Sequence, residues 1–508
     1  MTFAKVTASE SDGWAEHGAG VERGAPAMTA VVANSYQMFV GGEHVPALEG
    51  ETEEVLNPAT GEKLAEVPLG TTADVDAAVK VAADAFEAWS TLAPNERALP
   101  ILRLADRLEE HAEEFAQLES LNVGKPISIA REEIPFGVDC LRFFAGAART
   151  LEGRAAGEYV QGSTSIIRRD PLGVVGSVAP WNYPLLMGIW KIAPAILTGN
   201  TLVLKPSELT PLTTLRFAEL AADLLPPGVL NVITGHGETV GAALVSHPQV
   251  RMSSLTGDVS TGKEVMRAAA GNLKKLHLEL GGKAPVIVFD DADIELAVAK
   301  IREGGYMNSG QDCMAASRVY ASAGIHDDLL SELVPAVESI SMGDPNSEDT
   351  EMGPVISDRQ RSRVEGFVDR ALETGHAELA AGGKTNGNGF FYKPSIIVGA
   401  LQGDEIVQKE VFGPVVSVTR FDDEKEALRW ANDVEYGLAA SVFTSNVGRA
   451  LEAARVLQFG TVWINDHMPI AAEMPHGGFK QSGNGKDMSV YSLEEYTEIK
   501  HVMVNLHH

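Results

Sequence analysis

Residues 173–179 (GVVGSVA) form the first of a series of short apolar runs, which continues at 201–204 (TLVL), 229–233 (VLNVI), 252–255 (MSSL) and 284–289 (APVIVF). Longer stretches with helical spacing separate these runs. Short apolar runs bounded by glycine and proline are typical of buried strands. Their alternation with helices predicts βαβ units and a parallel sheet, and therefore an α/β fold.

The same alternation of short apolar runs and helical stretches occurs again further along the chain. A second series of strand-like runs lies at 318–321, 395–398, 415–420, 440–444 and 461–464. We therefore expect two α/β halves that meet near residue 280. Ahead of the first half, apolar residues spaced by three and four predict amphipathic helices over 75–89, 94–121 and 135–150.

Three segments lie outside this pattern. Residues 1–35 are rich in Gly, Ala, Ser and Glu and have no apolar period, which predicts a mobile tail. Residues 158–169 and 496–506 read as extended. Isolated strands need partners, and we expect another subunit to supply them.

Composition limits the classes of function. The formal net charge is -29, which argues against nucleic-acid or anionic-membrane partners and favours solubility. Two cysteines, Cys140 and Cys313, imply no disulfide framework, and no Cys/His spacing suggests a metal site. Neither a membrane-spanning apolar run nor a signal peptide is evident in the sequence. We expect a cytoplasmic protein, where the thiols stay reduced.

Cys313 is a candidate nucleophile. It ends the small polar segment 308–313 (NSGQDC), whereas Cys140 lies in an apolar run. A deprotonated thiol is a strong nucleophile and suits covalent catalysis. A cysteine with no chemical role is the alternative.

Glu279 and Asn182 are candidate partners for such a thiol. Glu279 lies between leucines in 276–283 (LHLELGGK), where burial would raise its pKa and suit it as a general base. Asn182 lies in 178–184 (VAPWNYP), where two prolines stiffen the backbone and an amide could donate to an oxyanion. The alternatives are a turn-capping carboxylate and an ordinary turn asparagine.

Three loops after predicted strands could hold phosphates. They are 205–208 (KPSE), 235–237 (GHG) and 255–262 (LTGDVSTG). The last opens a helix, whose free N–H groups could meet a pyrophosphate. None has the G-x-G-x-x-G pattern, so glycines that merely close loops are the alternative.

Taken together, these motifs resemble the aldehyde dehydrogenase superfamily, from about residue 36 to 503. The resemblance rests on 276–283 followed by 310–313, and on 180–182, 205–208, 410–414 (EVFGP) and 475–483 (PHGGFKQSG), all in the order of that family. It implies a fold of two Rossmann-like α/β domains with a β oligomerisation arm. It also implies oxidation of an aldehyde to a carboxylic acid with NAD as cofactor.

The resemblance assigns roles to residues. Cys313 would be the nucleophile, Glu279 the base for the hydrolytic water, and Asn182 a donor to the oxyanion. Lys205 and Glu208 would hold the adenosine ribose, and the carboxylate of Glu208 would disfavour NADP. The other residues that the resemblance places at the cofactor are Trp181, Gly257, Asp258, Thr261, Leu280, Gly281, Glu410 and Phe412.

Asp258 departs from the family pattern, which commonly has a small hydroxyl residue there. A carboxylate at this position would face the pyrophosphate and weaken NAD binding, or would turn away from it.

The resemblance also divides the chain into parts. We expect an NAD-binding domain over 36–151 and 171–281, an oligomerisation arm over 152–170 and 488–508, and a catalytic domain over 282–487. The expected assembly is a homotetramer built as a dimer of dimers, with a small-molecule aldehyde as the only other partner and no metal.

Several segments, including 132–135 (EEIP) and 473–478 (EMPHGG), resemble bacterial gamma-aminobutyraldehyde dehydrogenases and imply 4-aminobutanal as substrate. Tyr183 and Trp190 could line the tunnel for its ammonium group, and Glu132 or Glu133 could attract that group at the mouth. Betaine aldehyde and succinate semialdehyde are alternative substrates. A cofactor-independent cysteine hydrolase and an inactive structural homologue are alternatives of another class.

Overall fold

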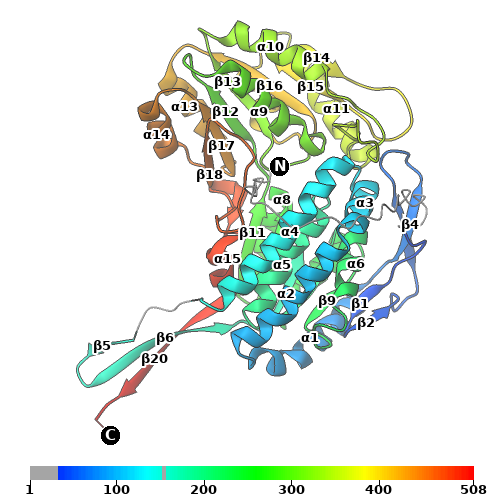
Figure 1. Cartoon of the computed structure of the whole chain (residues 1–508), viewed down its shortest axis with the longest axis vertical. Coiled ribbons are helices and arrows are strands. Elements are labelled where there is room, and N and C mark those ends of the chain that lie inside the picture. Colours follow the sequence, from blue (N-terminus) through cyan, green and yellow to red (C-terminus); the bar gives the residue numbers. More distant parts are fainter. Residues whose placement is uncertain (1–31, 152–155, 508) are drawn as a thin grey trace, which may run out of the picture.

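Two sheets organise the protein, which we describe from a computed structural model of residues 32–151 and 156–507 (Figure 1). The first has eight strands in the order β19-β11-β10-β7-β8-β9-β1-β2, and the second has seven in the order β14-β15-β16-β13-β12-β17-β18. Neighbours from β11 to β9 and from β15 to β18 are parallel, so the predicted α/β architecture is confirmed.

The strands of the first sheet are β1 (Met38–Val40), β2 (Glu43–Val45), β7 (Val174–Val178), β8 (Thr201–Lys205), β9 (Leu230–Val232), β10 (Val250–Gly257), β11 (Lys275–Leu280) and β19 (Gly483–Asn484). Those of the second are β12 (Ala284–Val288), β13 (Ala316–Ser322), β14 (Glu378–Gly383), β15 (Lys393–Val398), β16 (Val415–Phe421), β17 (Ala439–Phe443) and β18 (Thr461–Ile464). A separate hairpin pairs β3 (Thr52–Leu56) with β4 (Lys63–Pro68).

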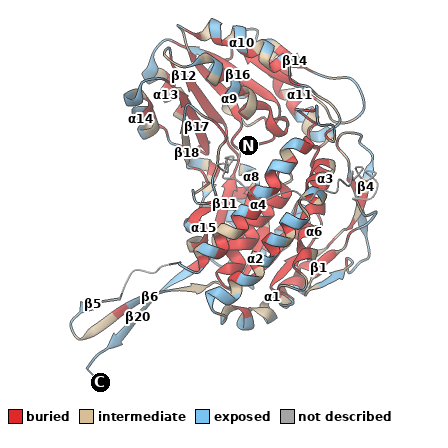
Figure 2. Ribbon diagram, viewed as in Figure 1, coloured by how far each residue is buried: buried red, intermediate tan, exposed pale blue. Residues whose placement is uncertain are grey.

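Helices cover both sheets. Figure 2 shows that those around the first sheet bury the faces they turn inward. The helix α5 is buried along its whole length, as an apolar helix in the centre of a large core should be. The helices are α1 (Thr72–Ser90), α2 (Pro94–Glu110), α3 (Ala112–Val123), α4 (Ile127–Ala148), α5 (Pro184–Leu197), α6 (Leu212–Leu220), α7 (Ala242–Ser246), α8 (Val259–Ala269), α9 (Ile294–Tyr306), α10 (His326–Glu338), α11 (Asp358–Glu373), α12 (Glu405–Gln408), α13 (Glu424–Asn432), α14 (Val447–Val456) and α15 (Ser489–Glu495).

Two helix predictions need correction. The segment 94–121 is divided into α2 and α3, because the backbone of His111 leaves helical geometry (φ -102°, ψ 14°) between them. The apolar period continues across the break, so sequence spacing could not reveal it. The helix expected over 135–150 begins earlier, at Ile127, and contains Pro135.

The arm strands pair within one chain, which corrects the expectation that another subunit supplies their partner. β20 (Thr497–Asn505) runs antiparallel to β6 (Ser163–Pro171), and β6 pairs with β5 (Gly157–Val160). Figure 1 shows this sheet projecting from the body. Of the predicted tail, residues 1–31 lie outside the described residues. Among the helices of the described chain, none has the length and apolar character needed to cross a membrane.

The segment after β18 is fixed to helix α5 by a buried ion pair. Lys191 of α5 lies 2.9 Å from a carboxylate oxygen of Asp487, and both side chains are fully buried. Burial opposes charge on Asp487, but Lys191 outweighs it and holds the pKa of that carboxyl below its usual value. The pair therefore anchors the loop that precedes α15.

Replacing Lys191 with methionine should destabilise the protein strongly. Lys191→Met keeps the volume but leaves Asp487 buried without its cation, which costs about 3–5 kcal/mol. Guanidinium chloride unfolding at fixed protein concentration measures the change. The control is Lys500→Met, which removes an exposed ion pair with Asp170 and should cost about 1 kcal/mol or less. Equal effects of the two variants would contradict the anchoring role.

Candidate active site

Cys313 lies at the end of a tight loop after α9. Asn308, Ser309 and Gly310 all have positive φ angles, of 49°, 59° and 66°. A Cβ on Gly310 would lie 2.2 Å from the carbonyl oxygen of Gly413, so the close packing there requires glycine. The loop leaves Cys313 partly exposed, whereas Cys140 is fully buried in α4.

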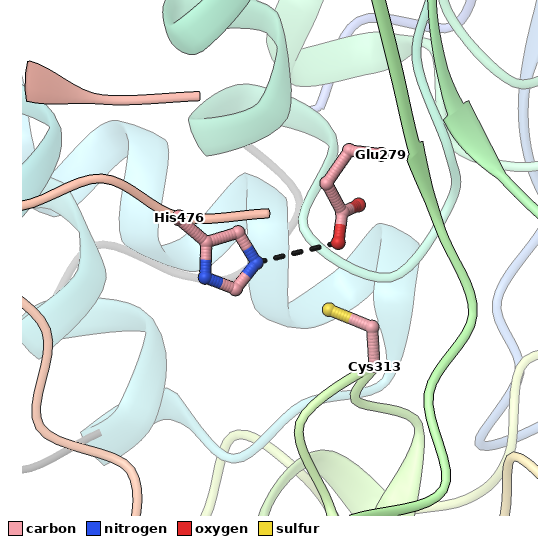
Figure 3. A group of neighbouring side chains, drawn as sticks. All are labelled: Glu279, Cys313 and His476. Atoms are coloured by element: carbon pink, nitrogen blue, oxygen red, sulfur yellow. Dashed lines mark hydrogen bonds and ion pairs between the residues drawn. The ribbon is translucent and has the colours of Figure 1, made fainter. Parts of the chain in front are cut away.

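The structure brings Glu279 next to Cys313. Glu279 is the penultimate residue of β11, is 1% exposed, and pairs across the sheet with Gly483 of β19. An oxygen of Glu279, the sulfur of Cys313 and a ring nitrogen of His476 all lie within 4.8 Å of one another (Figure 3). A carboxylate is therefore placed to take a proton from the thiol or from a water molecule beside it.

The surroundings of the thiol disfavour its ionised form. Burial and the nearby carboxylate of Glu279 raise the pKa of Cys313 well above its usual value, and Asp312 and Glu410 add to the effect. A resting thiol of this kind needs a base at the moment it attacks. The carboxylate of Glu279 lies within 4.8 Å of it.

Asn182 lies against the same loop. Its Nδ2 donates to the carbonyl of Gln311 at 3.0 Å, and its own carbonyl accepts from Asn308 at 3.1 Å. An amide nitrogen carries two hydrogens, so the second one is available to an oxyanion. The thiol, the carboxylate and the amide that the sequence singled out are thus gathered in one place.

The nucleotide-binding candidates lie where ligands bind in sheets of this type. In the first sheet the strand order reverses between β7 and β10, and crevices form outside the carboxyl ends of strands at such a point. Trp181 follows β7, and Gly257 ends β10. The hydroxyl of Thr256 is buried there without a hydrogen-bond partner among the described residues, so a polar ligand would satisfy it.

Lys205 and Glu208 form a pair at the end of β8. The ammonium group lies 3.2 Å from the carboxylate, with Lys205 buried and Glu208 partly exposed. Burial lowers the pKa of Lys205, and the lysine in turn outweighs burial and holds the pKa of Glu208 below its usual value. An ionised carboxylate at this edge fits the hydroxyls of a ribose and opposes a phosphate on them.

Glu410 and Phe412 face the joint between the sheets. Glu410 accepts a hydrogen bond from the backbone N–H of Gly282 at 2.8 Å, and burial raises its pKa to about 7. A Cβ on Gly281, which follows Leu280, would lie 2.3 Å from the Glu410 carboxylate. The ring of Phe412 meets that of Trp181 edge-on at 5.1 Å. These residues fit a cofactor that spans both sheets.

Asp258 turns toward its own helix. Its carboxylate accepts from the backbone N–H groups of Ser260 at 2.7 Å and Thr261 at 3.1 Å, and so caps α8. Burial opposes its charge, but the bonds to Ser260 and Thr261 lower the pKa of Asp258. The carboxylate of Asp258 therefore already accepts hydrogen bonds from N–H groups in the first turn of α8.

The two acidic substrate candidates have different surroundings. Glu133 is buried and shares the ammonium group of Lys125 with Glu119, and the exposed Glu132 lines a cavity of about 240 Å³ beside Tyr306 and Met307. A carboxylate enclosed with its own cation is not free to attract an ammonium group, so the tunnel-mouth interpretation is wrong for Glu133.

The two aromatic candidates also differ. Tyr183 donates to Asp312 at 2.8 Å, and its ring faces the Lys125 ammonium at 4.1 Å, so one face already has a cation. Trp190 packs against the ring of His476, with the ring centres 5.5 Å apart.

His476 is the residue that sequence reasoning missed. It is 2% exposed, and its Nε2 lies 3.3 Å from Oε1 of Glu279. The sequence contained one sign of its role, which is a histidine between Pro475 and two glycines. The segment 475–483 was used only as a motif of family resemblance. Its separation of 197 positions from Glu279 hid the contact.

The family to which these features belong is clear from comparison. The aldehyde dehydrogenase family profile matches residues 45–502, so the chain belongs to the aldehyde dehydrogenase family. It is similar to the betaine aldehyde dehydrogenase of Bacillus subtilis (strain 168), with 42% identity over 479 residues that cover 93% of this chain and 98% of the relative. An aldehyde dehydrogenase of Emericella nidulans is 41% identical over 92% of this chain and 95% of its own.

A solved structure shows the same fold. The betaine aldehyde dehydrogenase of Staphylococcus aureus in complex with NAD+ superposes with a TM-score of 0.92 at 40% identity, covering 94% of this chain and 97% of that one. The protein is an NAD-dependent aldehyde dehydrogenase. This finding disfavours the hydrolase and inactive-homologue alternatives. Two of these three relatives are betaine aldehyde dehydrogenases, and none of the three is named a gamma-aminobutyraldehyde dehydrogenase.

Replacing Asp258 with serine should tighten NAD binding. Asp258→Ser keeps a helix-capping oxygen and removes a negative charge, so the KM for NAD should fall about two- to fivefold. Steady-state kinetics at saturating aldehyde measure it. The control Asp293→Ser changes the equivalent cap of α9 and should leave that KM unchanged. An unchanged KM in Asp258→Ser would mean that the α8 terminus does not meet the cofactor phosphates.

Proposed function

We propose that the protein converts an aldehyde bearing a cationic amino group to its carboxylic acid through a thioester on Cys313. The observation that carries this proposal is the approach of the Cys313 thiol and the Glu279 carboxylate to within 4.8 Å. Asn182 and the donors of the loop complete the surroundings of a reacting carbonyl.

The chemistry follows from the positions of these groups. Glu279 accepts the thiol proton while the sulfur of Cys313 bonds to the aldehyde carbon, and the amide of Asn182 stabilises the oxyanion. Bound NAD would supply the acceptor for the hydride that leaves that carbon, so that a thioester remains on Cys313. Glu279 releases the thiol proton to solvent and then takes a proton from water as the water oxygen bonds to the thioester carbon. The carbon–sulfur bond breaks, the acid leaves, and Glu279 returns its proton to the sulfur of Cys313.

We assign the cofactor to residues of both sheets. Lys205 and Glu208 would hold the adenosine ribose, with Trp181, Gly257 and Thr261 along the cofactor. Leu280, Gly281, Glu410 and Phe412 would surround the nicotinamide half. The first sheet with its helices is the proposed NAD-binding domain and the second the catalytic domain.

The arm is the proposed oligomerisation element of a homotetramer. Its outer strand β20 exposes Ile499 at 64% and Met503 at 47%. An exposed apolar strand edge is a pairing surface, and contact with another subunit would cover it.

Betaine aldehyde is the first candidate substrate. The names of similar proteins support it, since betaine aldehyde dehydrogenases are among the relatives of this chain. 4-Aminobutanal is the second candidate, favoured by the segment 473–478. The burial of Glu133 removes part of the site first expected for that amine.

Replacing Cys313 with alanine should abolish aldehyde oxidation. Without the sulfur no thioester forms, and the rate should fall about a thousandfold or more. NADH formation measures turnover, and quenching of tryptophan fluorescence measures NAD binding, which should persist. Cys140→Ala is the matched control, since that thiol is fully buried in α4. Turnover by Cys313→Ala near the wild-type rate would refute the proposed nucleophile.

The two cationic aldehydes should be better substrates than an anionic one. We expect kcat/KM for betaine aldehyde to exceed that for 4-aminobutanal, and both to exceed that for succinate semialdehyde by about tenfold or more. NAD should be preferred over NADP with each aldehyde, because Glu208 repels a 2′-phosphate. Succinate semialdehyde as the best substrate would contradict a site built for cations.

A further inference from the structure

Glu279 has a second neighbour besides the thiol. His476 faces it from the loop after β18, and its Nε2 lies 3.3 Å from Oε1 of Glu279. Figure 3 shows the imidazole, the carboxylate and the thiol converging from three separate parts of the chain. An oxygen of Glu279 also lies within 4.8 Å of the sulfur of Cys313. The carboxylate thus lies between a ring nitrogen and a sulfur.

The fold fixes His476 from both sides. Its backbone exchanges two hydrogen bonds with Asp487, of 2.9 and 2.7 Å, and Asp487 is bound to Lys191 in the core. The next part of the loop returns to pair Gly483 with Glu279 itself. The ring of Trp190 packs against the imidazole. The histidine is therefore a rigid neighbour of the carboxylate and not a surface side chain that happens to reach it.

In the hydrogen bond between His476 and Glu279, the imidazole is the donor and the carboxylate is the acceptor. An ionised carboxylate only accepts hydrogen bonds, so the nitrogen that faces it carries the hydrogen. Nδ1 of His476 and Oε2 of Glu279 are buried and have no hydrogen-bond partner among the described residues. A neutral imidazole with its hydrogen on Nε2 leaves a lone pair unpaired, which is less costly than an unpaired buried N–H.

We propose that His476 is a positioning residue: its Nε2–H holds the carboxylate of Glu279 facing Cys313. This inference rests on the function proposed above. Glu279 takes the thiol proton as the carbon–sulfur bond forms, releases it to solvent, and later takes a proton from water, while His476 keeps its own protons throughout. Without the imidazole the carboxylate loses its only nitrogen donor among the described residues and is free to turn.

Other titratable groups surround the trio and must be considered in any pH profile. Asp312 and Glu410 act on the thiol, Lys486 acts on Glu279, and Asp487 acts on His476. Lys191 and His277 in turn face Asp487. The His476 variants leave all of these groups in place.

His476→Phe keeps a ring against Trp190 and removes both nitrogens. Its kcat should fall about tenfold or more, the factor that one lost hydrogen bond to a charged group represents, while the KM for NAD stays within twofold. His476→Gln, whose amide can reach the position of Nε2, should recover most of the rate. His277→Gln, a buried histidine of β11 that does not contact Glu279, is the matched control. All assays contain EDTA, because the trio has metal-ligand chemistry.

A double-mutant cycle distinguishes a positioning role of His476 from a purely structural one. It tests whether the loss of kcat in His476→Phe depends on the presence of the Glu279 carboxylate. In a Glu279→Gln background, His476→Phe should add little further loss, because the group it positions is already gone. The pH profile of Cys313 alkylation by iodoacetamide should shift to lower pH in His476→Phe, since a carboxylate that turns away no longer disfavours the thiolate.

The outcomes separate the two proposals. Wild-type kcat in His476→Phe, additive losses in the cycle, or failure of His476→Gln to recover any rate would overturn the positioning role. If Glu279→Gln and Cys313→Ala were both fully active, the proposed function would fail instead. Should His476→Phe not fold, His476→Gln and its alkylation profile still decide the question, because an unshifted profile with reduced kcat would overturn it.

Discussion

The connection between the two sheets passes through a contact that only glycine permits. A Cβ on Gly282 would lie 2.0 Å from the carbonyl oxygen of Cys313, and one on Gly281 would lie 2.3 Å from the carboxylate of Glu410. This close approach brings the loop of the second sheet against the end of β11. The distance between Glu279 and Cys313, and with it the reaction, depends on that backbone contact.

Buried ion pairs surround the site. Lys191 pairs with Asp487, which fixes the loop of His476, and Lys125 is shared by the buried carboxylates of Glu119 and Glu133 beneath Tyr183. A buried charge without a counter-ion would cost several kcal/mol. These pairs stabilise little by themselves, but they leave few alternative positions for the segments they join.

At the N-terminus of α8, a side-chain carboxylate and an anionic ligand compete for the same backbone N–H groups. Asp258 gives its carboxylate to the cap of its own helix and so competes with any phosphate for the same N–H groups. The helix gains a stable start, and the cofactor loses part of an anion site. An acidic cap and an anionic ligand cannot both be favoured at one helix terminus.

The sequence by itself determined the α/β class, the two series of strands, and the three residues Cys313, Glu279 and Asn182, because strand length, glycine placement and motif order are local properties. It did not determine the break at His111, where the apolar period runs on without interruption. Only the tertiary structure showed that Glu133 is paired, that the arm strands bond to each other, and that His476 meets Glu279. Those contacts join residues far apart in the chain, and packing in three dimensions, not spacing along the sequence, brings them together.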